Sequence, residues 1–104
     1  MTIPTFIVSD NFPHHQLNTL YKQEYGEVRF VCDLIDTAWW KRPTLIATRN
    51  GDILPKFNKR MLLEKRDGSS ILIIRRLQSN DTGIYECETM GAIKQYNLTV
   101  TGNL

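Results

Sequence analysis

The sequence contains few of the residues from which catalytic and metal sites are built. Its only histidines, His14 and His15, are adjacent, so in an extended segment they point in opposite directions and make a poor metal pair. Its only cysteines, Cys32 and Cys87, lie 55 positions apart, too far for a C-x-x-C redox or metal motif. A glycine-rich phosphate loop is absent and the carboxylates are scattered. We therefore expect no enzyme activity, no metal ion and no cofactor.

Long apolar runs are also missing. No stretch approaches the roughly 20 residues of a membrane-spanning helix, and no basic region followed by an apolar segment indicates a signal peptide. We expect this chain to be a domain excised from a larger protein, whose signal and anchor lie elsewhere. The net charge of +2 is too small to indicate binding to nucleic acid or a membrane. A basic cluster in the middle of the chain is typical of a solvated sheet face: Lys59, Arg60, Lys65, Arg66, Arg75 and Arg76.

The length and the residue pattern indicate one all-β domain. A chain of 104 residues, 41% hydrophobic and 23% charged, suits a single globular domain over residues 1–104, with its core in about 5–100. Helical apolar stripes are absent, whereas short alternating or β-branched runs recur between turn signals such as Asn50-Gly51. We expect strands at residues 5–8, 17–21, 27–32, 38–41, 44–48, 59–65, 71–77, 84–90 and 93–100. This spacing is typical of a β-sandwich or barrel.

An ordered set of residues surrounds the two cysteines. Two tryptophans, Trp39 and Trp40, follow Cys32, and Tyr85 stands two residues before Cys87. The spacing L-x-I-x-x-L-x-x-x-D-x-G-x-Y-x-C is formed by Leu72, Ile74, Leu77, Asp81, Gly83, Tyr85 and Cys87. We expect the three aliphatic residues to fill the core, and Asp81 to pair with Arg60 at the base of the sandwich.

This set resembles the immunoglobulin superfamily over about residues 5–100, as an I-set or short V-type domain. The resemblance implies a Greek-key sandwich of two antiparallel sheets, joined by a Cys32–Cys87 disulfide. The alternative is a cytosolic domain with both thiols reduced. Trp39 follows Cys32 by only seven residues, fewer than is usual in the family, so the identity of the core tryptophan is open. The family's W-x-K pattern matches Trp39-Trp40-Lys41 and assigns Trp39 to the core.

Strand alternation then places Trp40 on the outer face of what the family would name the GFCC′ sheet. With Leu45 or Ile46 on the neighbouring strand, it would form an exposed apolar patch, which typically marks a protein interface. Met90, Ile93 and Tyr96 of the last hairpin would extend this patch. The alternative is that Trp40 and Ile46 are covered by the N-terminal segment or by a neighbouring domain.

The 44–48 strand and the apolar face are similar to neuronal adhesion domains of the Dpr, DIP and IgLON type. That likeness implies an extracellular module of a cell-surface adhesion molecule or receptor, bound to another immunoglobulin domain or to a secreted ligand. The alternatives are an intracellular sarcomeric scaffold domain of the titin type and a secreted soluble binding protein. Two sequons favour the extracellular setting and make Asn80 and Asn97 candidate N-glycosylation sites.

Overall fold

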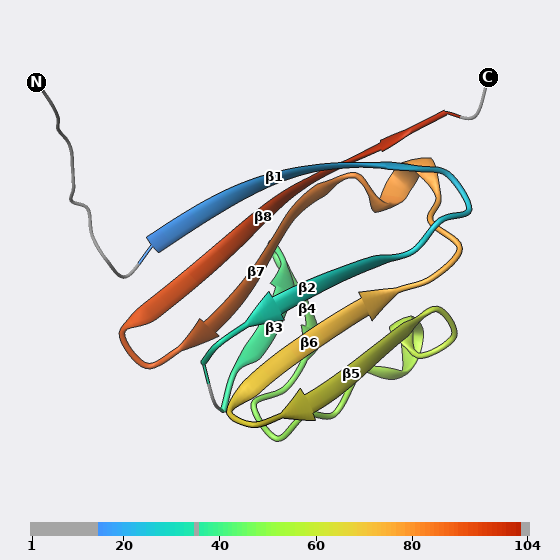
Figure 1. Ribbon diagram of the computed structural model, residues 1–104. Helices are drawn as coiled ribbons and strands as arrows, with labels where there is room; N and C mark the ends of the chain where they lie inside the picture. Colours follow the sequence, from blue (N-terminus) through green and yellow to red (C-terminus); the bar gives the residue numbers. More distant parts are fainter. Residues whose placement is uncertain (1–14, 35, 103–104) are drawn as a thin grey trace, which may run out of the picture.

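The computed structural model describes residues 15–34 and 36–102, which form two β-sheets packed face to face (Figure 1). The larger sheet has five strands in the order β1-β8-β7-β3-β4, and the smaller has three in the order β2-β6-β5. The strands of the larger sheet are β1 (His15–Gln23), β3 (Ala38–Lys41), β4 (Thr44–Ala47), β7 (Gly83–Thr89) and β8 (Ala92–Thr101). Those of the smaller sheet are β2 (Val28–Cys32), β5 (Met61–Arg66) and β6 (Ser69–Ile74). The all-β sandwich expected from the sequence is confirmed.

Most strands lie where the sequence predicts them, and the differences in their bounds have local causes. β1 runs parallel to β8 over nine residue pairs, so it is longer than the predicted 17–21 strand, and the larger sheet is mixed where two antiparallel sheets were expected. β6 ends at Ile74, before the predicted end at residue 77, because Arg76 adopts a left-handed backbone with φ 50°. The predicted 59–65 strand begins later, at Met61, after the 3-10 helix η1 (Pro55–Phe57). The predicted strand at residues 5–8 lies outside the described residues.

The core lies between the two sheets and follows the predicted alternation. In β2, Val28, Phe30 and Cys32 are buried, whereas Arg29 and Val31 face outward. Each fully buried large apolar side chain contributes about 1.5–3 kcal/mol relative to an exposed one. The largest wholly buried side chains are Trp39, Tyr85, Phe30, Ile46, Leu72, Ile74, Leu77 and Leu98.

The Asn50-Gly51 turn forms where the sequence predicts it. The amide of Gly51 (φ 91°) donates to the carbonyl of Thr48 at 2.9 Å. The chain after the turn does not form a strand beside β4, but pairs with it at the isolated β-bridge Ala47–Ile53. Within residues 15–34 and 36–102, no helix is long and apolar enough to cross a membrane.

Candidate functional site

The two sheets are joined at the predicted disulfide. Cys32 of β2 and Cys87 of β7 are bonded, with their Cα atoms 6.5 Å apart. Trp39 stands opposite Cys87 across β3 and β7, is wholly buried, and donates from Nε1 to Oγ of Ser70 at 2.9 Å. Ser70 in turn pairs with Cys32. Trp39 is therefore the tryptophan that packs at the disulfide, as the W-x-K pattern indicates.

Hydrogen bonds and an ion pair to Asp81 hold together the segments at the base of the sandwich. Tyr85 donates its hydroxyl to the Asp81 carbonyl at 2.6 Å, which is a tyrosine corner. Arg60 donates from both terminal nitrogens to the Asp81 carboxylate, at 2.8 and 3.0 Å, so the predicted ion pair forms. Burial opposes ionisation of Asp81, but the Arg60 hydrogen bonds and the Gln78 amide outweigh it and lower the pKa of the carboxyl.

Gly83 lies where another side chain crosses its strand. Its φ is 154°, and an added Cβ would lie 2.7 Å from Cε of Lys41. The Lys41 side chain continues past Gly83 and donates to the Asn80 carbonyl at 2.6 Å. Its burial lowers the pKa of the ammonium, although the Asp81 carboxylate acts in the opposite direction. Both the backbone conformation of Gly83, at the start of β7, and the crossing Lys41 side chain therefore disfavour a larger residue there.

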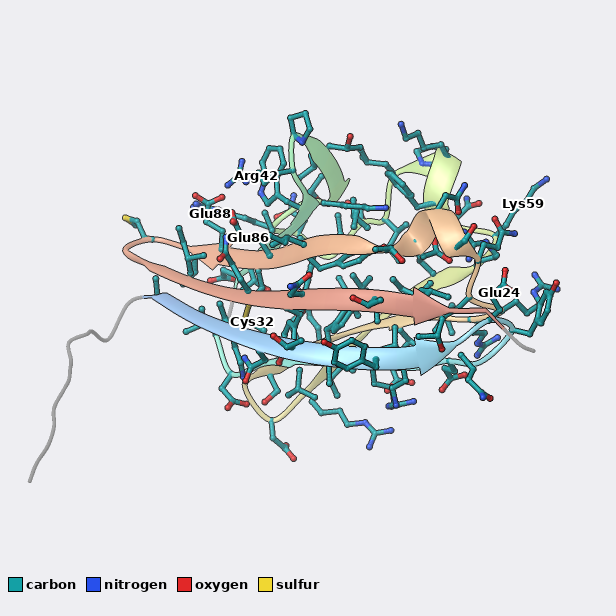
Figure 2. All side chains as sticks on the ribbon, turned by 90° about the horizontal axis from the view of Figure 1, so that it is seen from above. Glu24, Cys32, Arg42, Lys59, Glu86 and Glu88 are labelled. Carbon is teal, nitrogen blue, oxygen red and sulfur yellow. A yellow bond between two sulfur atoms is a disulfide. The ribbon has the colours of Figure 1, made fainter. Side chains whose placement is uncertain are left out.

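The outer face of the five-stranded sheet carries a network of charged and polar side chains. The register places Leu45, Trp40, Glu86 and Gln95 in one row across β4, β3, β7 and β8. The Glu86 carboxylate is buried beneath Arg42, which contacts it at 2.6 Å, and Gln95 donates to it at 2.9 Å. Arg42 also contacts Glu88 at 3.0 Å, and the two carboxylates flank the guanidinium in Figure 2.

Trp40 lies under this network, half-buried. The Arg42 guanidinium stacks on its ring, 4.1 Å from the ring centroid, in a cation–π contact. Its Nε1 is buried and, among the described residues, has no hydrogen-bond partner. We name the surface formed by Trp40, Arg42, Leu45, Glu86 and Glu88 the Trp40 face.

Two residues predicted for the interface are not on this surface. Ile46 is wholly buried, because Leu45 faces outward opposite Trp40 and the next residue of the strand points to the opposite face. Tyr96 is also buried: its ring stacks on Phe30 at 4.8 Å, and its hydroxyl donates to the Val31 carbonyl. The interface prediction was wrong for both.

The other predicted interface residues reach the surface. Leu45 and Ile93 are half-buried on the outer face, and Met90 is 85% exposed at the turn between β7 and β8. Ile84 and Tyr21, which the sequence reasoning missed, are also exposed and share this sheet face by their register. The alternation of β7 around buried Tyr85 and Cys87 could have identified Glu86 and Glu88, which that reasoning also missed, as outward residues.

Asn80 and Asn97 differ in their surroundings. Asn80 is exposed in the 3-10 helix η2 (Ser79–Asp81). Asn97 is half-buried in β8, between Ile84 and Thr19, on the sheet face that carries Trp40. Glycosylation of both remains a prediction.

The described part of the chain contains no group of three or more histidine, cysteine, aspartate or glutamate side chains that could hold a metal ion. Comparison of the chain with known protein families and with curated proteins found no match.

Proposed function

We propose that this protein is an extracellular immunoglobulin-like module that binds another protein through the Trp40 face. The disulfide between the sheets, Trp39 packed at it and the tyrosine corner at Tyr85 are the features that mark such domains. In that scheme, β8, β7, β3 and β4 correspond to the G, F, C and C′ strands. A disulfide persists in an oxidising compartment, which supports a cell-surface or secreted setting over an intracellular scaffold.

The arrangement of Trp40 and Arg42 is the observation that carries the proposal. Tryptophan and arginine are enriched among the residues that dominate binding energy. Here they stack on each other, and Glu86 and Glu88 hold the guanidinium in place. A side chain already fixed loses little conformational freedom on binding, so less of the interaction energy is lost to ordering. Leu45 adds apolar surface beside the ring.

A second copy of the chain is the partner that this face fits best. A two-fold contact requires one surface to be complementary to itself. The Trp40 face presents a cation at Arg42 and a partly exposed carboxylate at Glu88, whose side chain is 32% exposed. Arg42 of one copy can therefore approach Glu88 of the other, while the Trp40 and Leu45 side chains meet near the axis. The pairing suits adhesion between identical surface proteins.

Sedimentation velocity over a concentration series tests this proposal. We expect a monomer–dimer equilibrium that Trp40→Ala and Arg42→Ala each weaken. Leu62→Ala is the matched control, because Leu62 is 37% exposed on β5 in the other sheet. A chain that stays monomeric at millimolar concentration, or an equilibrium that Leu62→Ala weakens as much as Trp40→Ala, would contradict the proposal.

A further inference from the structure

A second surface, at the end of the sandwich away from Arg42, has the character of an anion site. A hollow of about 420 Å³ is lined by Tyr25, Lys59, Arg60, Arg76 and Gln78. These residues come from three segments: the turn between β1 and β2, the approach to β5, and the chain after β6. Figure 2 places Lys59 at the opposite end of the molecule from Arg42, Glu86 and Glu88. We name this hollow the basic pocket.

Two of the three cations in the basic pocket are not neutralised by a carboxylate of the described chain. Three of the five lining residues are cations, and none is a carboxylate. Arg60 is paired with Asp81, but Lys59 and Arg76 have no ion-pair partner among the described residues.

Glu27 pairs with Arg29 at 3.7 Å and with Arg75 at 4.0 Å. An anion entering the pocket would therefore meet two cations, Lys59 and Arg76, that have no ion-pair partner among the described residues.

The basic pocket is held in shape by hydrogen bonds between its three segments. The amide of Tyr25 donates to the Leu77 carbonyl at 2.7 Å, and the amide of Arg75 donates to the Arg60 carbonyl at 2.9 Å. The Arg60 guanidinium also reaches the carbonyls of Arg75 and Arg76, at 3.3 and 3.4 Å. These hydrogen bonds fix the backbone segments that carry the cations, so less conformational entropy is lost when a ligand binds.

The backbone at the rim gives a second indication. Tyr25 (φ 69°) and Arg76 (φ 50°) are two of the four non-glycine residues with positive φ in the described chain. Residues other than glycine rarely adopt this backbone conformation, and those that do are often found at ligand sites. Here it directs an arginine to the pocket and leaves the Tyr25 side chain 71% exposed.

From these contacts we infer that the basic pocket binds a sulfated sugar chain. Guanidinium and ammonium groups bind the oxygens of a sulfate, and the exposed Tyr25 ring offers a face against which the C–H groups of a sugar can pack. Arg75 lies beside the pocket, with its side chain 57% exposed and 4.0 Å from the Glu27 carboxylate. This inference is independent of the Trp40 face.

Titration with a short heparin oligosaccharide, followed by calorimetry and amide NMR, tests the inference. We expect Lys59→Ala and Arg76→Asn each to weaken binding by about tenfold, since each removes one charge-assisted contact. Asparagine is chosen because it tolerates the left-handed backbone at position 76. Arg49→Ala is the charge-matched control: Arg49 is exposed in the turn that follows β4. Near-ultraviolet circular dichroism and the melting temperature show that each variant is folded.

The ligand series separates the outcomes. Affinity should fall with added salt, and a desulfated oligosaccharide should not bind. Equal binding by the two pocket variants and the natural chain, or an equal loss in Arg49→Ala, would overturn the inference. If inorganic sulfate binds as tightly as the oligosaccharide, the pocket holds a single free anion, and the assignment to a sugar chain fails.

Discussion

The same substitution should destabilise the protein much more at Trp39 than at the adjacent Trp40. Trp39 is wholly buried and bonded to Ser70, whereas Trp40 is half-buried and its Nε1 has no partner in the described chain. In Trp39→Phe, the lost ring contacts and the cavity cost about 1–2 kcal/mol, comparable to one or two buried methylenes. The Ser70 hydroxyl, left buried without its donor, adds about 1–3 kcal/mol. We expect a total of about 2–5 kcal/mol.

Trp40→Phe removes a donor that already lacks a partner and keeps an aromatic ring under Arg42. We expect it to change the free energy of unfolding by less than about 1 kcal/mol. Each variant keeps one tryptophan, so its fluorescence follows denaturant unfolding of the oxidised domain directly. The difference between the two variants should also appear in the melting temperature, at about 4–8 °C per kcal/mol.

A double-mutant cycle isolates the hydrogen bond from the cavity. Ser70→Ala in the Trp39→Phe background removes the unsatisfied hydroxyl, so the double variant should be more stable than the sum of the two single losses predicts, by about 1 kcal/mol. Equal losses in Trp39→Phe and Trp40→Phe, or strict additivity in the cycle, would refute this account of the core.

Three further predictions concern the base of the sandwich. Gly83→Ala should lower the free energy of unfolding by about 1–3 kcal/mol, because alanine is strained at its φ of 154° and its Cβ would displace the Lys41 side chain; thermal unfolding measures this. Tyr85→Phe should cost about 1–3 kcal/mol in denaturant unfolding, because the buried Asp81 carbonyl loses its donor. The pKa of Asp81 is lowered in the folded chain, so its stabilisation is present above the ordinary value of 3.8 and lost as pH falls through the folded value. Acid titrations of stability should therefore show a smaller loss in Arg60→Gln than in the natural chain, and equal losses would contradict the role of the ion pair.

The sequence was sufficient to place residues whose separation along the chain determines which other residues they contact. Cys32, Trp39 and Tyr85 could be assigned because their separations match a recurrent pattern of strand pairing. Arg60 and Asp81 could be paired because the strand before β6 and the turn after it meet at the same end of the sheet.

The interface was less predictable, because it depends on register. The shift between Trp39 and Trp40 adds Ala47 to the core beside Ile46, and the sequence of β4 alone does not show whether Leu45 or Ile46 faces outward. Tyr96 faces inward because it stands opposite Tyr85, a pairing set by the β7–β8 turn. The Arg42–Glu86 contact joins the turn after β3 to β7, so it can be predicted only when the turn and the strand are both placed.

The central claim, that the Trp40 face binds a second copy of the chain, is tested most directly by NMR spectra recorded from micromolar to millimolar concentration. The two indole N–H resonances report on opposite environments: Trp39 is bonded in the core, and Trp40 lies beneath Arg42. We predict that the Trp40 indole and the amides of β3, β4 and β7 shift with concentration, while the Trp39 indole stays fixed. Shifts confined to the outer face of β5 and β6, or spectra that do not change with concentration, would contradict the claim.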